Sequence, residues 1–202
     1  MKKILCFGDS NTYGYNPKDS TRLNDRWSAL LKQKLFSFGF EVVEQGHNNR
    51  KCFIDDGSLE LTSPRILPRA FNKTYDYLVL AVGINDTQKL YSTTQEDFKQ
   101  GIINLVNIAR KISPSIKILI LSPSILKDSV VNHFYFSNLF DYSSIQKSKE
   151  IFSAYKSAAI ETKCDIINLD DYASVSNIDG LHYDSLAHKT IAEKLFQYFT
   201  LE

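Results

Sequence analysis

Five short apolar runs alternate along the chain with longer segments of mixed polarity. The runs are Ile4–Phe7, Phe40–Val43, Tyr77–Val82, Ile116–Leu121 and Ile166–Leu169. The third and fourth runs are almost continuously apolar, which is typical of strands buried on both faces. Strands of this kind form parallel sheets that helices cover on both sides.

Between the runs, apolar residues recur every three or four positions, which is the spacing of an amphipathic helix. The pattern predicts helices over residues 27–38, 98–112, 144–162 and 187–199. Because strands and helices alternate, the sequence predicts an α/β sandwich with a mainly parallel sheet. No repeat or linker divides the sequence, so we expect a single domain over residues 1–202.

Composition and charge narrow the classes of function. The chain has 202 residues, and its 24 basic residues nearly cancel its 23 acidic ones. A nucleic-acid-binding protein more often carries a basic stripe, so we expect no nucleic-acid partner. No segment has the length and hydrophobicity of a membrane span, and we interpret the short apolar stretch near the start as a strand rather than a signal peptide. These features predict a soluble, cytoplasmic protein without a membrane partner.

The cysteines and glycines give no sign of a cofactor. Cys6, Cys52 and Cys164 are far apart and odd in number, which fits neither a disulfide framework nor a metal site. We interpret them as small buried apolar residues. Clustered metal-ligand spacing and phosphate- or dinucleotide-binding glycine motifs are absent from the sequence. We therefore expect neither a metal nor a cofactor.

Polar residues follow the predicted strands at the sheet edge where parallel α/β proteins bind ligands. Residues 8–11, Gly-Asp-Ser-Asn, follow the first run, and residues 45–50 follow the second. Residues 83–86, Gly-Ile-Asn-Asp, follow the third run, and residues 179–182, Asp-Gly-Leu-His, follow the fifth across a loop. One edge is therefore predicted to receive a serine, a glycine turn, an asparagine and an Asp/His pair.

These residue types suit nucleophilic attack on an ester. A serine hydroxyl needs a base to remove its proton, and histidine serves at neutral pH. His182 could activate Ser10, while Asp179 could orient the imidazole and stabilise its charged form. The oxyanion needs donors that already point toward it, and the backbone N–H groups of Ser10 and Gly46 and the side chain of Asn85 are the candidates.

Each motif alone also has an ordinary structural explanation. A Gly-Asp-Ser triplet can fill a turn, residues 83–86 could end a strand and cap a helix, and residues 179–182 could form a surface turn. Four motifs in this order, each beside a predicted strand or the last helix, favour the catalytic interpretation.

The ordered motifs resemble the SGNH hydrolases, also called the GDSL esterase/lipase family. Within that family the segments GDSNTYGY, DRWSALL, EVVEQGHNNR and GINDT resemble the arylesterase/acyltransferase-like subgroup. The resemblance implies a flavodoxin-like, three-layer α/β/α fold with a five-stranded sheet. It implies Ser10 as nucleophile, His182 as base and Asp179 as its orienting acid, with Gly46 and Asn85 in the oxyanion hole. The implied activity is hydrolysis of small carboxylic esters without a cofactor, with acyl transfer as a secondary reaction.

Differences from the family pattern concern the pocket. Asn11 stands where the name-giving leucine of the family would be, and residues 47–49 are His-Asn-Asn instead of smaller or apolar residues. Because they lie just past the nucleophile, we expect Asn11, Tyr13 and Tyr15 to contact the substrate. His188 is expected to be a solvated residue at the start of the last helix.

Three alternatives remain open at this point. A carbohydrate O-deacetylase would use the same triad with a different pocket. A non-catalytic, flavodoxin-like binding module could hold a phosphate in the loop after the first strand. The long irregular segment 125–143 either borders the pocket, or forms a contact in a homo-oligomer, or covers the core with its aromatic residues.

Overall fold

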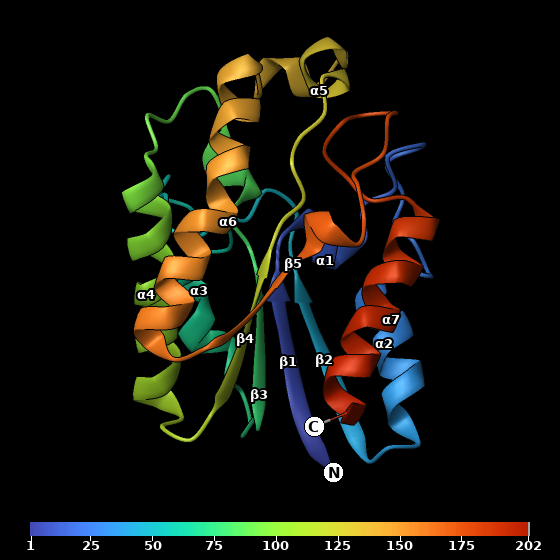
Figure 1. Ribbon diagram of the computed structural model, residues 1–202, viewed down its shortest axis with the longest axis vertical. Helices are drawn as coiled ribbons and strands as arrows, with labels where there is room; N and C mark the ends of the chain where they lie inside the picture. The colour runs from blue at the N-terminus through green and yellow to red at the C-terminus, as the bar shows by residue number, and fades with distance from the viewer. Residues whose placement is uncertain (202) are drawn as a thin grey trace.

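A five-stranded parallel sheet lies between two layers of helices in the computed structural model, which describes residues 1–201 (Figure 1). The strands are β1 (Lys2–Gly8), β2 (Phe40–Gly46), β3 (Tyr77–Ala81), β4 (Lys117–Ser122) and β5 (Asp165–Asn168). Their spatial order is β2-β1-β3-β4-β5, and every neighbouring pair is parallel. The predicted α/β sandwich built on these five runs is confirmed.

Helices of very different length connect the strands. The longer ones are α2 (Trp27–Phe36), α3 (Ser63–Ala70), α4 (Gln95–Ile112), α6 (Tyr142–Thr162) and α7 (Ser185–Leu201). The short ones are α1 (Ser10–Tyr13), α5 (Ser129–Asn132) and the 3-10 turns η1 (Ile84–Thr87), η2 (Phe136–Asn138) and η3 (Leu169–Asp171). Helices α3, α4 and α6 cover one face of the sheet, and α2 and α7 cover the other (Figure 1).

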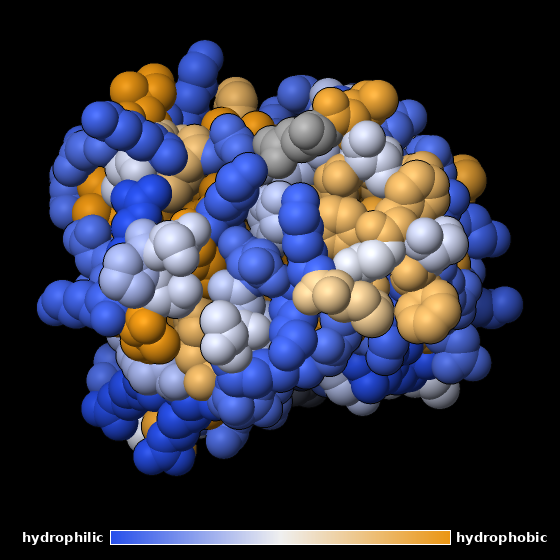
Figure 2. All heavy atoms as spheres, turned by 90° about the horizontal axis from the view of Figure 1, so that it is seen from below, coloured by the Kyte–Doolittle hydropathy of each residue, from blue (hydrophilic) through white to orange (hydrophobic). Residues whose placement is uncertain are grey.

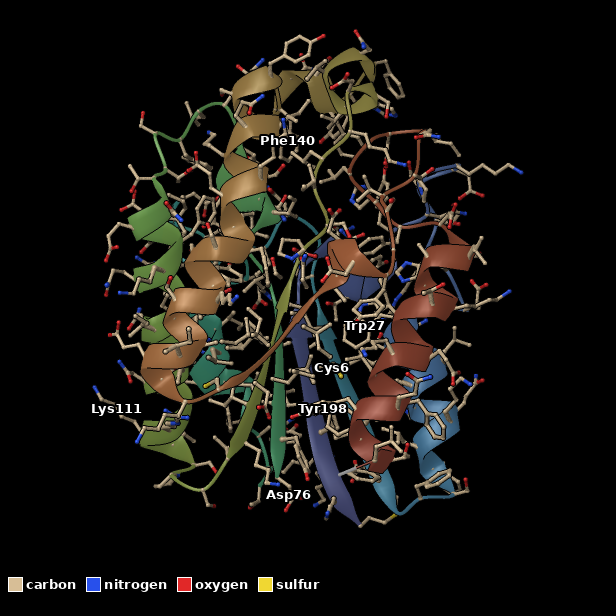
Figure 3. All side chains as sticks on the ribbon, viewed as in Figure 1. Cys6, Trp27, Asp76, Lys111, Phe140 and Tyr198 are labelled. Carbon is tan, nitrogen blue, oxygen red and sulfur yellow. The ribbon has the colours of Figure 1, made fainter. Side chains whose placement is uncertain are left out.

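The central strand β1 shows why the predicted strands are so apolar. Leu5 and Phe7 belong to the core under α3, α4 and α6, whereas Ile4 and Cys6 belong to the core under α2 and α7. Cys6 of β1 and Trp27 of α2 both belong to this second core, between the sheet and the helices α2 and α7 (Figure 3). Each large apolar side chain buried in this way stabilises the fold by about 1.5–3 kcal/mol. From Ile4 to Gly8, this central strand between two helical layers therefore has no position that faces water.

Helix α3 is absent from the sequence prediction. Its eight residues include Pro64 and Pro68, which interrupt the sequence pattern of a helix. Pro64 lies in the first turn, where a missing N–H removes no helical hydrogen bond. Ile66 and Leu67 are nevertheless buried against the core. Tertiary packing therefore maintains a helix that its two prolines conceal in the sequence.

The far end of the molecule carries the chain termini and lies away from the strand ends that bear the polar motifs (Figure 1). Seen from this end, the surface is largely hydrophilic and its hydrophobic residues lie in separate areas (Figure 2). Among the helices of residues 1–201, none combines the length and the hydropathy required to cross a membrane.

Candidate active site

Ser10 begins α1 immediately after the central strand β1 ends. The side chain of Asp9 caps this helix by accepting a hydrogen bond from the backbone N–H of Asn11 at 2.9 Å. The change from strand to helix within two residues holds Ser10 at the carboxyl edge of the sheet. The Ser10 side chain is largely buried but lines a cavity.

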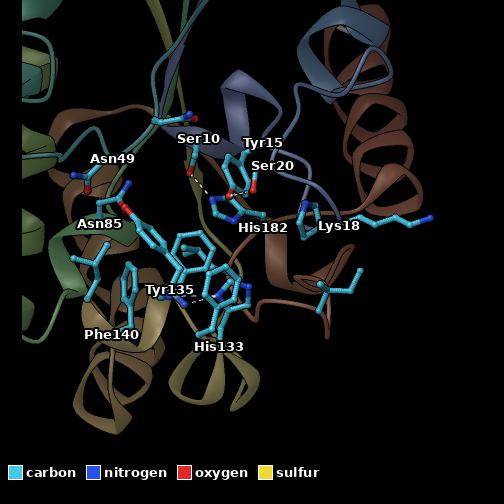
Figure 4. A pocket seen from close by; sticks show the side chains of 17 residues that line it. Ser10, Tyr15, Lys18, Ser20, Asn49, Asn85, His133, Tyr135, Phe140 and His182 are labelled. Carbon is cyan, nitrogen blue, oxygen red and sulfur yellow. Dashed lines mark hydrogen bonds between the residues drawn. The ribbon is translucent and has the colours of Figure 1, made fainter.

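The structure brings Ser10, His182 and Asp179 into one hydrogen-bonded series. The Nε2 atom of His182 lies 2.9 Å from the Oγ of Ser10, and its Nδ1 atom lies 2.6 Å from Oδ2 of Asp179 (Figure 4). A carboxylate accepts only, so it places the imidazole proton on Nδ1 and leaves Nε2 free to accept from the serine hydroxyl. This is the arrangement of groups that activates a serine nucleophile.

Asp179 is held in its charged form by the turn that it shares with His182. Burial by itself would raise the pKa of this carboxyl, but hydrogen bonds from the His182 ring and from nearby backbone N–H groups outweigh it and lower the pKa. Those N–H groups belong to Leu181 and His182, and both lie 3.0 Å from Oδ1. Asp179 therefore remains an acceptor at neutral pH.

Gly180 is the residue that allows this turn. Its φ is +69°, in the left-handed region that favours glycine. A Cβ placed there would lie 2.4 Å from the backbone nitrogen of Val130. The turn therefore packs directly against the start of α5, and Lys127, just before that helix, donates its N–H to the Gly180 carbonyl at 3.0 Å.

Two aromatic rings flank the imidazole of His182. The Tyr15 ring lies 4.2 Å from it, centre to centre, at an angle of 32°, and the Phe136 ring lies 5.2 Å away. These rings restrict rotation of the imidazole. Their π faces also favour the positive charge that the ring acquires when it takes a proton.

Asn85 faces Ser10 from the 3-10 turn after β3 (Figure 4). Its Nδ2 donates one hydrogen bond to the carbonyl of Arg50 at 3.1 Å. A carboxamide has two N–H groups, so this contact orients the side chain and leaves one donor for the cavity. Asn85 lines the same cavity as Ser10, and its role as an oxyanion donor stays a prediction.

Gly46 ends β2 beside Gly8 in the parallel register. An added Cβ would lie 2.2 Å from the backbone nitrogen of Tyr13, so α1 packs directly against this position. Gly46 does not line the cavity that contains Ser10 and Asn85. Its role as a second backbone donor stays a prediction.

Arg50 ties the loops of the site together. Its buried guanidinium donates to the carbonyl oxygens of Gly8, at 2.9 Å, and of Gln45, and it lies 4.4 Å above the Phe7 ring. It does not line the cavity. Arg50 therefore holds the ends of β1 and β2 rather than the substrate.

Asp86 anchors the same loops from the neighbouring turn. Its carboxylate accepts hydrogen bonds from the backbone N–H groups of Cys52, Phe53 and Ile54 at 2.6–3.0 Å. Burial raises the pKa of Asp86 to about 6 despite these donors. The three backbone donors offset part of the cost of burying this carboxyl. Through them, the turn that carries Asn85 is joined to residues 52–54.

A cavity of about 630 Å³ opens in front of Ser10 and His182. Asn48, Asn49 and Asn85 contribute polar groups to its wall. The opposite wall comes from segment 125–143, which supplies His133, Phe134, Tyr135, Phe136 and Phe140 (Figure 4). Phe136 and Phe140 are buried, whereas Phe134 and Tyr135 are exposed. The segment thus both covers the core and borders the cavity.

Of the three residues expected to contact the substrate, only Tyr15 lines this cavity. Tyr13 packs against Arg22, whose guanidinium carbon lies 4.6 Å from the centre of the Tyr13 ring. Asn11 is buried and turns its carboxamide toward the backbone on both sides of His182. The expectation for Asn11 and Tyr13 is therefore corrected, because α1 directs both side chains away from the cavity.

The expectation for His188 is also corrected. The side chain is completely buried, and its Nδ1 accepts a hydrogen bond from the backbone N–H of Trp27 at 3.2 Å. Burial lowers its pKa to about 4. His188 is therefore a neutral residue that joins the starts of α2 and α7. Within residues 1–201, histidines, cysteines and carboxylates form no group of three or more that could hold a metal ion.

The chain matches the model of the GDSL-like Lipase/Acylhydrolase family over residues 6–190, and it belongs to that family. Fold and family together place it in the class of carboxylic ester hydrolases. A curated relative is YxiM of Bacillus subtilis (strain 168), described as an uncharacterized esterase, which is 27% identical over 107 residues. That match covers 52% of this chain, and the chain spans about a quarter of the relative, 26% of its length.

Solved structures of similar proteins cover the whole fold. Est24, a carbohydrate acetylesterase from Sinorhizobium meliloti, has a TM-score of 0.90 and 25% identity, over 100% of this chain and 99% of its own. The aryl esterase of M. smegmatis has a TM-score of 0.89 and 27% identity, over 98% of both chains. These similarities argue against a non-catalytic, flavodoxin-like binding module.

Proposed function

We propose that this protein is a serine esterase that hydrolyses small, short-chain carboxylic esters through an acyl-enzyme on Ser10. The observation that carries the proposal is the hydrogen-bonded series from Ser10 through His182 to Asp179, with distances of 2.9 and 2.6 Å. It lies at the wall of a cavity that can admit a substrate.

Acylation begins when Ser10 Oγ attacks the ester carbonyl carbon. Nε2 of His182 takes the hydroxyl proton, and Asp179 stabilises the imidazolium that forms. The carbonyl oxygen becomes an oxyanion, to which Asn85 and the backbone N–H groups of Ser10 and Gly46 donate hydrogen bonds. Collapse of this intermediate breaks the ester C–O bond, and the imidazolium gives its proton to the departing alcohol.

Deacylation uses the same groups with water as the nucleophile. His182 takes a proton from water as the water oxygen attacks the acyl carbon. When the second intermediate collapses, the proton returns to Ser10 Oγ and the carboxylic acid leaves. Tyr15 and Phe136 keep the imidazole in place through both half-reactions.

The two walls of the cavity differ in chemistry, which supports separate binding places for the acyl half and the alcohol half of the ester. The acyl carbon must lie beside Ser10 and Asn85, on the side where Asn48 and Asn49 make the wall polar. The alcohol half then faces the aromatic wall of segment 125–143. The test is a panel of p-nitrophenyl esters from acetate to octanoate, measured with the wild type and Ser10→Ala. We expect the highest kcat/KM with acetate or butyrate, and equal rates for the two proteins would overturn the proposal.

Carbohydrate O-deacetylation is the second candidate, and the asparagines of the cavity favour it. Gln88 donates to the Oδ1 of Asn49 at 2.7 Å, which leaves the Asn49 amide N–H groups available to sugar hydroxyls. Aromatic faces opposite these amides could pack against a sugar ring. Rates with acetylated xylose and with an aryl acetate, compared at equal concentration, distinguish the two substrates.

Acyl transfer is the secondary reaction that we propose for the same intermediate. An alcohol bound against the aromatic wall would attack the acyl carbon in place of water. Adding methanol or butanol to a p-nitrophenyl acetate reaction should then produce the methyl or butyl ester. Formation of acetic acid alone would exclude transfer to these alcohols.

A further inference from the structure

Asn11 connects the two distant parts of the chain that form the catalytic site. It follows Ser10 directly and is 8% exposed. Its Nδ2 donates to the carbonyl of Leu181 at 3.2 Å, and its Oδ1 accepts from the N–H of Tyr183 at 3.0 Å. These two backbone groups stand on either side of His182. One carboxamide therefore binds the peptide segment that carries the base.

We propose that Asn11 is a positioning residue that sets the separation between Ser10 Oγ and His182 Nε2. This inference rests on the proposed function, since it concerns the efficiency of the same site. It assigns to Asn11 a role in the catalytic geometry in place of the substrate contact that its position in the sequence suggests.

The other hydrogen bonds of the triad cannot set this distance. Asp179 binds the His182 ring and the backbone N–H groups of Leu181 and His182. All these partners belong to the turn that contains Asp179 itself. The bonds therefore shape the turn and orient the ring, but they do not relate the turn to Ser10.

The hydrogen bond between Ser10 and His182 is also unsuited to this task. Once Ser10 is acylated, its Oγ has no proton to donate, and His182 must then be in place for water. The two hydrogen bonds of Asn11 involve only a side-chain amide and backbone groups, so no proton transfer alters them. They can hold His182 at one separation from residue 10 through the whole cycle.

A carboxamide is the group that fits both partners. It offers a donor to the Leu181 carbonyl and an acceptor to the Tyr183 N–H. Leucine offers neither, and an ionised aspartate keeps the acceptor but loses the donor. A misplacement of about 1 Å between reacting groups can cost 10²-fold in rate. We therefore expect Asn11→Leu and Asn11→Asp to lower kcat by about 10–100-fold with KM changed less than about twofold.

The experiment measures kcat, KM, the pre-steady-state acylation rate and fluorophosphonate labelling of Ser10 in both variants. Ser148→Ala is the matched control, because Ser148 also accepts from one backbone N–H, that of Leu126, and donates to one carbonyl, that of Ile145. The control loses the same kinds of bond away from the triad. It should lose thermal stability while its kcat stays within about twofold of the wild type.

The outcomes separate this inference from the proposed function. A wild type that neither hydrolyses p-nitrophenyl acetate nor reacts with the fluorophosphonate overturns the proposed function. An active wild type whose Asn11 variants retain its kcat and labelling rate overturns the inference alone. Asn11→Asp preserves the side-chain volume, so it remains informative if Asn11→Leu does not fold.

A crystal structure of Asn11→Asp gives a readout that does not depend on turnover. We expect the distance between Ser10 Oγ and His182 Nε2 to exceed the usual hydrogen-bond limit of about 3.2 Å. An unchanged separation in that variant would contradict the positioning role.

Discussion

The imidazole Nε2 of His182 lies 2.9 Å from the hydroxyl oxygen of Ser10, although 172 positions separate the two residues along the chain. Ser10 is placed by the end of the central strand β1, and His182 by the loop that leads into α7. Because α7 packs beside α2 over one face of the sheet, the loop before α7 passes the carboxyl end of β1 (Figure 1). The complete sheet, rather than any local segment, therefore produces the contact between Ser10 and His182.

Removal of the charge on Asp179 should greatly reduce turnover. In Asp179→Asn the amide no longer enforces a proton on Nδ1 of His182, so Nε2 is not reliably free to accept from Ser10. The equivalent change in other Ser-His-Asp enzymes lowers kcat by about 10⁴-fold, and we expect a loss of that order with p-nitrophenyl acetate.

The control for this prediction is Asp184→Asn. Asp184 is exposed, and its Oδ1 accepts from the N–H of Ala187 at 2.9 Å at the start of α7. An amide oxygen can keep that bond, so activity should be unchanged. If Asp179→Asn kept kcat within about tenfold of the wild type, the orienting role of Asp179 would be wrong.

Loss of the Asn85 amide should slow both half-reactions. Asn85→Ala removes a donor aimed at the cavity, and the loss of one such donor typically costs about 10²–10³ in kcat. Because the donor acts mainly on the oxyanion, KM should change far less than kcat. The steady-state constants for p-nitrophenyl acetate check this expectation.

Asn132→Ala is a suitable control for that change. Asn132 is exposed and, like Asn85, donates to a backbone carbonyl, that of Asp128 at 3.3 Å, but it does not line the cavity. Its kcat should match that of the wild type. A similar loss of activity in both variants would show that Asn85 has no particular effect on the oxyanion.

The sheet was predictable because strands that are buried on both faces have continuous apolar runs in the sequence. All residues from Ile4 to Phe7 face one core or the other, so the run is apolar without interruption. Helix α3 was not predictable in this way, because Pro64 and Pro68 conceal a segment that is stabilised by packing of Ile66 and Leu67.

The site residues also differ in how far the sequence could predict their positions. Ser10, Asn85 and His182 were predicted to lie together from motifs whose order follows the sheet edge, and all three line one cavity. The orientation of Asn11 depends on where residues 181–183 pass, about 170 positions away. His188 depends likewise on the N–H of Trp27, 161 positions away. Neither contact belongs to a motif, so nothing in the sequence near Asn11 or His188 pointed to these distant partners.

His188 should make part of the stability depend on pH. Its pKa is about 4 in the folded protein because burial disfavours the charged ring, against about 6.5 in the unfolded chain. Between these values the unfolded chain binds a proton that the folded protein excludes, so this contribution to stability falls as the pH drops. From pH 7.5 to 5 the loss is about 2 kcal/mol.

Urea unfolding of the wild type and His188→Gln near pH 7.5 and pH 5 tests this contribution. Burial raises the pKa of Asp9 to about 7 and that of Asp86 to about 6, which gives the opposite pH dependence. Both carboxyls are present in both proteins and cancel in the difference. The free energy of unfolding of His188→Gln should therefore rise relative to that of the wild type as the pH falls. His47→Gln is the control for the substitution. Parallel stability curves would contradict a buried neutral His188.

The central claim is that Ser10 forms a covalent bond with the substrate, and peptide mapping by mass spectrometry after reaction with a fluorophosphonate tests it most directly. We predict one adduct, on the peptide that contains Ser10, together with complete loss of esterase activity. Ser10→Ala should acquire no adduct and should have no turnover above background. An adduct on another residue, or ester turnover by Ser10→Ala at the wild-type rate, would contradict the account.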